Sequence, residues 1–138
     1  MKNVRTSFTN KHRDSWVEIN LEYLEENIFN IKEKIKNVEN KNLTAVIKAD
    51  GYGHGSLMIA PPLLACGINS FGVASLDEGI ELRENKIDCP ILVLGAVPVW
   101  AFETALDYDI EISVFNKEHI EEIESLHDLL SNLKTDEI

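Results

Sequence analysis

The chain has 138 residues and a mass of 15.6 kDa, with 44% hydrophobic and 27% charged residues. This size and balance suit one globular domain, because domains commonly contain roughly 100–150 residues. The 13 Lys and Arg residues stand against 24 Asp and Glu residues, and the resulting net charge of −11 argues against nucleic acid or an anionic membrane as the main partner.

The first predicted elements follow a polar lead-in at residues 1–14. Residues 20–36 carry apolar side chains three and four positions apart, which predicts an amphipathic helix with Asn20 at its capping position. Residues 43–47 form a short, largely apolar run, which is typical of a buried parallel strand. A glycine-rich turn follows at residues 48–55.

Residues 56–66 are predicted to form the second helix. The proline pair at 61 and 62 predicts a break and a restart inside it, because proline removes a hydrogen bond from the helical ladder. Residues 71–74 form the second strand. The Ser-x-x-Glu pattern at 75–78 is a capping box that opens a helix reaching about Asn85.

The remaining elements repeat the same alternation. Residues 91–94 form the third strand, a weaker helical pattern covers 100–106, and residues 110–114 form the fourth strand. Asn116 caps a last helix, and residues 129–138 are predicted to be a polar tail.

Strand and helix therefore alternate four times, which indicates an α/β fold built from βα units around a parallel sheet. Four units form either an open twisted sheet or part of a (β/α)8 barrel, a fold that typically needs about 250 residues to close. Both architectures place their sites at the carboxyl ends of the strands.

Lys48 directly follows the first strand and is the candidate nucleophile. A lysine there either simply reaches water, or presents a desolvated amine that forms Schiff bases. Glycines at 51, 53 and 55 permit left-handed backbone, although their spacing is not a dinucleotide fingerprint. Tyr52 either turns its phenol toward a phosphate or packs its ring. His54 either shuttles protons or holds the loop through hydrogen bonds.

Other reactive side chains form no recognisable site. His12, His119 and His127 lie off any metal-ligand spacing, so no metal site is predicted. Without a G-x-S-x-G sequence, a serine hydrolase has no support. Cys66 and Cys89 follow no pattern and indicate structural thiols in a reducing compartment, which predicts the cytoplasm. No run of roughly 20 apolar residues predicts a membrane span.

The segment AVIKADGYGHG at residues 45–55 resembles the pyridoxal-phosphate attachment motif of alanine racemases. Three further segments resemble that family: WVEINL at 16–21 with Leu24 and Asn27, FGVASLDEGIELR at 71–83, and PILVLG at 90–95. The resemblance covers residues 13–127.

The resemblance implies four βα units of a partial (β/α)8 barrel and the interconversion of L-alanine and D-alanine, which supplies D-alanine for peptidoglycan. Lys48 would bind pyridoxal 5′-phosphate as a Schiff base and act as a base on one face of the α-carbon. Tyr52 matches the tyrosine that contacts the cofactor phosphate. Val46 and Leu94 fall where apolar residues wall the cofactor, and Asp50 stands where many relatives have Asn.

The same resemblance implies parts that these residues do not include. Family members are usually well over twice this length, have a β-domain after a full barrel, and form head-to-tail dimers. The partner's β-domain supplies a tyrosine as the opposite-face base. Later barrel strands supply further phosphate contacts, and an arginine faces the pyridine nitrogen. We therefore expect residues 15–128 to form a truncated N-terminal half-barrel that is inactive alone.

Three alternatives remain open at this stage. The chain could be completed by a separately encoded second half, it could bind pyridoxal phosphate without racemising, or it could be a remnant that associates with an intact racemase. A half-barrel also leaves open strand edges, which predict self-association. A monodisperse monomer in light scattering would contradict that prediction.

Overall fold

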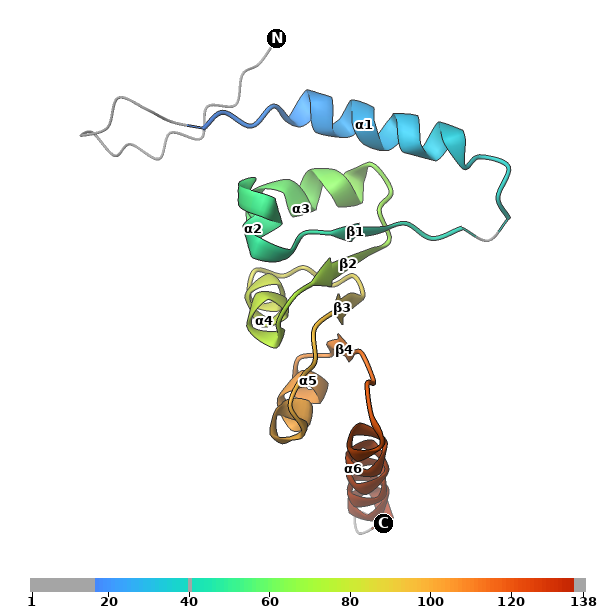
Figure 1. The fold of residues 1–138 in the computed structure, drawn as a ribbon, viewed down its shortest axis with the longest axis vertical. Coiled ribbons are helices and arrows are strands. Elements are labelled where there is room, and N and C mark those ends of the chain that lie inside the picture. The colour runs from blue at the N-terminus through green and yellow to red at the C-terminus, as the bar shows by residue number, and fades with distance from the viewer. Residues whose placement is uncertain (1–16, 40, 136–138) are drawn as a thin grey trace, which may run out of the picture.

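The computed structural model describes residues 17–39 and 41–135, so the predicted lead-in at 1–14 lies outside the described residues. Strands and helices alternate along the described chain (Figure 1). The elements in chain order are α1 (Leu21–Lys34), β1 (Thr44–Val46), α2 (Lys48–Gly53), α3 (Ser56–Ala65), β2 (Ser70–Val73), α4 (Leu76–Glu84), β3 (Ile91–Val93), the 3-10 helix η1 (Val99–Ala101), α5 (Phe102–Asp107), β4 (Glu111–Ile112) and α6 (Lys117–Thr135).

The four strands form one parallel sheet in the order β1-β2-β3-β4. Val46 pairs with Gly72, and Gly72 pairs with Leu92, so the first three strands are in register at this level. Within the described residues, β1 and β4 form the two edges of the sheet, and α1 and α6 lie at opposite ends of the strand order (Figure 1). Sequential parallel strands with a helix between them are consecutive βα units, as predicted.

The core lies on one face of the sheet. Successive side chains of a strand point to opposite faces, and Phe71, Val73, Ile91 and Val93 are almost completely buried. Their cluster includes residues from α3, α4 and α5: Ile59, Leu63, Leu82 and Phe102. The other face carries Val46, which is 41% exposed, so the described helices leave this face open.

Helix α3 shows that the predicted break at its prolines is wrong. The helix runs from Ser56–Ala65 without interruption, although Pro61 and Pro62 lie inside it. Buried residues stand on both sides of the pair, Ala60 before it and Leu63 after it, so core packing holds the two halves in line. The fixed φ of proline is itself helical, so the cost that packing must offset is the missing N–H donors and the contact of each ring with the carbonyl four residues earlier.

Asparagine caps start both terminal helices, as predicted. The Asn20 side-chain oxygen accepts the N–H groups of Glu22 and Tyr23 at 2.9 and 3.2 Å. The Asn116 side-chain oxygen accepts the N–H of His119 at 2.9 Å. Each asparagine thereby satisfies donors that the first helical turn cannot satisfy by itself.

Helix α6 continues to Thr135 and so extends into the 129–138 segment that was predicted to be a polar tail. The sequence contains a reason, because leucines at 126, 130 and 133 continue the helical spacing of three and four. Among the described residues, α6 included, no helix combines the length and the apolar character needed to cross a membrane.

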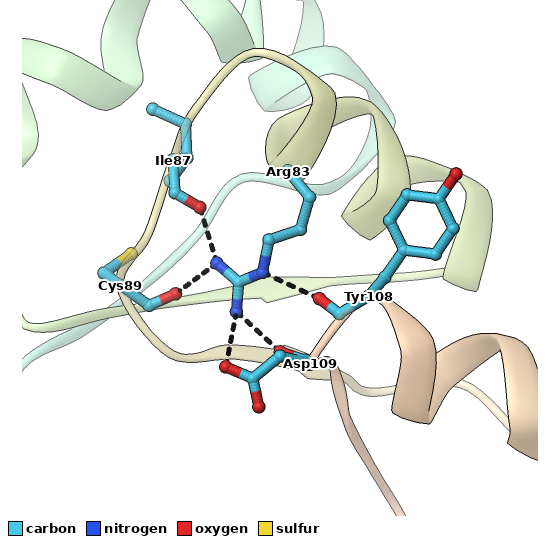
Figure 2. Close-up of polar contacts among 5 residues, drawn as sticks. All are labelled: Arg83, Ile87, Cys89, Tyr108 and Asp109. Carbon is cyan, nitrogen blue, oxygen red and sulfur yellow. Dashed lines mark hydrogen bonds and ion pairs between the residues drawn. The ribbon is translucent and has the colours of Figure 1, made fainter.

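Arg83, near the end of α4, joins the loops that precede β3 and β4 (Figure 2). Its Nη1 donates to the carbonyls of Ile87 and Cys89 at 2.5 and 2.7 Å. Its Nε and Nη2 donate to the carbonyls of Tyr108 and Asp109 at 3.0 and 2.6 Å. The Arg83 side chain is only 12% exposed, so a largely buried charge ties together the amino end of the sheet.

Candidate functional site

Lys48 lies at the carboxyl end of β1, where the sequence predicted it. Ile47 still belongs to the sheet, because it is buried and its N–H donates to the Gly72 carbonyl at 2.9 Å. Lys48 itself is partly buried. The lysine therefore stands where the packed strand gives way to the open end of the sheet.

The short segment α2 is not an ordinary right-handed helix, because a left-handed turn follows Lys48 directly. Ala49, Asp50, Gly51 and Tyr52 have φ angles of 51°, 53°, 62° and 56°. Such a run is rare, because left-handed backbone costs roughly 1–2 kcal/mol for each residue with a side chain. Left-handed backbone was predicted for the glycines, but not for the three other residues of this turn.

Hydrogen bonds fix this turn. The Asp50 carboxylate accepts the Ser56 N–H at 2.7 Å and the Ser56 hydroxyl at 3.2 Å, and the Asp50 carbonyl accepts the Gly55 N–H at 2.9 Å. His54 Nδ1 donates to the Gly51 carbonyl at 2.9 Å, which supports the alternative in which His54 holds the loop. Short polar side chains such as Asp and Asn tolerate left-handed backbone because they bond locally, so Asp50 suits its position.

Glu78, in the first turn of α4, holds the other side of the turn. One carboxylate oxygen accepts the Ala49 N–H at 2.7 Å, and the other accepts the Ala74 N–H at 2.7 Å. Ser75 accepts the Glu78 N–H at 3.4 Å, so the serine half of the predicted capping box is present while the Glu78 side chain bonds elsewhere. The sequence analysis did not predict this role of Glu78. The signal that could have indicated it is the capping box at 75–78, which directly follows the second strand.

Tyr52 lies beside the lysine. Lys48 Nζ is 6.0 Å from the centroid of the Tyr52 ring, at the limit of a cation–π contact, and Tyr52 is 60% exposed. The structure therefore brings the predicted amine and the predicted phenol together at one end of the sheet, with the phenol ring open to solvent.

Val46 and Leu94 are neighbours on the open face of the sheet. A Cβ built on Gly72 would lie 3.4 Å from a Val46 methyl and 3.3 Å from a Leu94 methyl. The two side chains therefore meet over Gly72, and each is 41% exposed. They form a small apolar surface on β1, β2 and the end of β3, beside the strand end that carries Lys48.

A hollow lies at the β4 edge of the sheet, away from Lys48. It is an apolar groove of about 290 Å³ between α5, β4 and α6, lined in part by Phe102, Ile112, Ile123 and Leu126. Across residues 17–39 and 41–135, no three His, Cys, Asp or Glu side chains gather as a metal ion would require. Because Lys48 and Tyr52 lie together at the carboxyl end of β1, that end of the sheet is the candidate site.

Comparison with known proteins connects this geometry to one family. The alanine racemase N-terminal domain family matches residues 19–134. The alanine racemase of Clostridium kluyveri is 52% identical over 101 residues, which are 73% of this chain and 25% of that protein. The alanine racemase of Clostridium tetani is 47% identical over 115 residues, 82% of this chain and 29% of that protein.

The chain belongs to the alanine racemase N-terminal domain family. It spans about a quarter to three tenths of the length of the curated relatives that it matches. The family resemblance predicted from residues 13–127 is confirmed.

Solved structures of alanine racemases match the fold as well. The Bacillus anthracis enzyme, solved with bound L-Ala-P, matches with a TM-score of 0.76 and 37% identity over 83% of this chain and 29% of that chain. The Clostridium difficile 630 enzyme matches with a TM-score of 0.70 and 38% identity over 81% of this chain and 28% of that chain. Family membership decides between the two predicted architectures: the four βα units are those of a partial (β/α)8 barrel.

Proposed function

We propose that this chain supplies the cofactor-attachment site of an alanine racemase, which interconverts L-alanine and D-alanine with pyridoxal 5′-phosphate. The observation that carries the proposal is Lys48, held at a strand end by a left-handed turn of four residues. The proposal assigns residues 15–128 to the half-barrel. It places the reaction in the cytoplasm, where D-alanine is made for peptidoglycan.

The residues at this end of the sheet suit pyridoxal phosphate. An amine and an exposed phenol lie side by side, with 6.0 Å between Lys48 Nζ and the Tyr52 ring centroid. Beside them, Val46 and Leu94 offer an apolar surface whose centre, at Gly72, has no side chain. When bound, the cofactor withdraws electrons from the α-carbon of an amino acid and makes its C–H bond acidic.

The chain's own residues then have separate tasks. Lys48 Nζ anchors the cofactor and takes or returns the α-proton on its own face of the substrate. Tyr52 holds the cofactor phosphate through its phenol, while Val46 and Leu94 keep water from one side of the site. The left-handed turn determines where Lys48 Nζ can reach.

We propose further that these 138 residues do not racemise alanine by themselves. Racemisation needs a base on each face of the α-carbon, and the resemblance assigns only Lys48 to this chain. The resemblance assigns the second base to the β-domain of a partner subunit and assigns no such domain to these residues, so pairing of two copies of them would not supply it. The open edges of β1 and β4 in the described sheet support self-association as a part of this proposal.

Reductive trapping tests the proposal. The purified chain is incubated with pyridoxal 5′-phosphate, reduced with borohydride and mapped by peptide mass analysis. We expect a visible absorbance band before reduction and one pyridoxyl adduct, on Lys48. Lys48→Ala should abolish both signals. The matched control Lys117→Ala, which removes a lysine whose side chain is 87% exposed, should keep both.

Two other outcomes would contradict parts of the proposal. Pyridoxyl groups scattered over several lysines would show that the chain forms no selective site. Conversion of L-alanine to D-alanine by the chain alone would contradict the proposed need for a second base.

A further inference from the structure

We propose that Glu78 is a positioning residue for Lys48, whose carboxylate sets the backbone from which the lysine amine is presented. This inference deepens the proposed function and rests on it, because it concerns the same site. It starts from the two bonds that Glu78 accepts, from Ala49 and from Ala74, each at 2.7 Å.

The regular hydrogen bonding between β1 and β2 ends directly before Lys48. The Ile47 N–H donates to the Gly72 carbonyl at 2.9 Å, so the next regular bond would run from the Ala74 N–H to the Ile47 carbonyl. The Ile47 carbonyl instead accepts the Gly51 N–H at 2.8 Å, inside the left-handed turn. The Ala74 N–H donates to the Glu78 carboxylate instead, so this carboxylate lies where the hydrogen bonding between β1 and β2 stops.

The Glu78 carboxylate is connected to Lys48 through one peptide group. The Ala49 N–H belongs to the planar peptide group that begins at the Lys48 carbonyl carbon. A hydrogen bond to that N–H therefore sets the rotation about the bond between the Lys48 Cα and its carbonyl carbon. Ala49 is also the first left-handed residue of the turn, with φ 51°, so Glu78 bonds the turn where it leaves Lys48.

Glu78 is anchored to two packed elements, the end of β2 and the start of α4. Ala74 directly follows β2, whose last residue, Val73, is almost completely buried and accepts the Leu94 N–H at 2.8 Å. Glu78 also lies in the first turn of α4, where a negative charge is favoured by the helix dipole. The carboxylate thus relates Lys48 to two elements of the core, and it needs both oxygens to do so.

The experiment compares Glu78→Gln with Asp77→Asn. Glutamine keeps the shape of Glu78 but has only one acceptor oxygen, so it cannot receive both N–H groups. Asp77 is exposed and lies next to Glu78 in the first turn of α4. Asp77→Asn therefore changes the net charge of the chain, and the charge near the N-terminus of α4, by the same amount as Glu78→Gln. Asp77→Asn is therefore a matched control.

Three measurements are made on each full chain. Reductive trapping gives the share of pyridoxyl label on Lys48, amide hydrogen exchange gives the protection of Ala49 and Ala74, and urea denaturation gives the stability. We expect Glu78→Gln to lower the Lys48 labelling rate about tenfold relative to the other lysines, which corresponds to about 1.4 kcal/mol. The Ala49 and Ala74 amides should lose protection in the same variant. Asp77→Asn should match the wild type in the Lys48 labelling rate and in the protection of the Ala49 and Ala74 amides.

Each outcome decides something different. Selective labelling of Lys48 that survives Glu78→Gln would overturn the positioning role and leave the proposed function standing. If the wild-type chain labels no lysine selectively, the proposed function fails, and the exchange rate of the Ala49 amide still tests whether Glu78 holds the turn. If Glu78→Gln does not fold, the wild-type exchange rates decide, because an unprotected Ala49 amide in the intact chain would overturn the inference.

Discussion

The two ends of α4 hold the two ends of the sheet by opposite chemistry. Near the end of the helix, Arg83 donates to four backbone carbonyls of the loops before β3 and β4 (Figure 2). In the first turn, Glu78 accepts two backbone N–H groups that follow β1 and β2. Each charge also agrees with the helix dipole, which favours an anion at the N-terminus and a cation at the C-terminus.

The backbone differs between the two ends. At the amino end, Lys86 has a φ of 64°, and the Ile87 N–H donates to the Leu82 carbonyl at 3.1 Å, as in an ordinary left-handed helix ending. At the carboxyl end, four successive residues after Lys48 are left-handed. Strain of that kind persists only where neighbouring contacts over-determine it. The amino end of the sheet therefore has an ordinary helix ending and a largely buried arginine, while the carboxyl end holds strained backbone directly after Lys48.

Removing the guanidinium at the amino end should have the largest effect. Arg83→Met leaves four carbonyls without their donor, and we expect the free energy of unfolding to fall by about 3 kcal/mol. Urea denaturation measures the change. The variant should still label Lys48 selectively at urea concentrations where it remains folded, because the hydrogen bonds of Arg83 go to the loops at the amino end of the sheet.

Lys117→Met is the control for Arg83→Met. It also removes a cation with an ion-pair partner, Glu121 at 2.7 Å, but the Lys117 side chain is 87% exposed. Exposed pairs contribute little, so we expect a change within about 0.5 kcal/mol. Equal effects of the two substitutions would show that Arg83 is no more than a surface charge.

Gly51, in the left-handed turn, and Gly53, directly after the turn, allow an intermediate test. Gly51 has a φ of 62°, and a Cβ there would lie 2.7 Å from Ile59 Cδ1, whereas Gly53 has a φ of 82° and nothing within 4 Å of an added Cβ. We expect Gly51→Ala to lower the free energy of unfolding by about 2–3 kcal/mol and Gly53→Ala by about 1 kcal/mol. Thermal denaturation of both variants checks the order. Equal losses would mean that backbone conformation alone, without packing against α3, governs the turn.

Local patterns predicted most of the fold. Runs of apolar residues and helical spacing located all four strands and the helices α1, α3, α4, α5 and α6, because such patterns reflect the burial of one face. The segment labelled α2 was predicted as a glycine-rich turn. The strand ends were less predictable: residues 110–114 were expected, and β4 is Glu111–Ile112. The proline pair of α3 was misread because packing of Ala60 and Leu63 outweighs the lost hydrogen bonds, which no local rule contains.

The candidate site was predicted only in part, for a related reason. Lys48 and the glycines were found because their motif is contiguous in the sequence. Glu78 bonds Ala49 across 29 positions, and Arg83 bonds Asp109 across 26 positions. Contacts between residues so far apart in the sequence depend on how the βα units pack against one another. The sequence therefore showed Glu78 only as part of a capping box, and Arg83 only as a basic residue in the last turn of a helix.

The smallest predicted effect concerns the thiol beside the arginine. Burial raises the pKa of Cys89 above its ordinary value of 9.0, and the charge of Arg83 opposes this shift. In the unfolded chain the thiol loses its proton near 9.0, while in the folded chain it keeps the proton to higher pH. The contribution to stability is therefore complete below about pH 9 and is lost as the pH rises further.

Cys66→Ala leaves Cys89 as the single thiol, because the sequence has only 2 cysteines. Thiolate absorbance of this variant should then rise at a higher pH in buffer than in concentrated urea. A common midpoint would mean that the thiol is as well solvated in the folded chain as in the unfolded chain. In that case the loop before β3 would be open to water. The contacts of Arg83 with this loop would then be solvated, and their expected contribution to stability would be smaller.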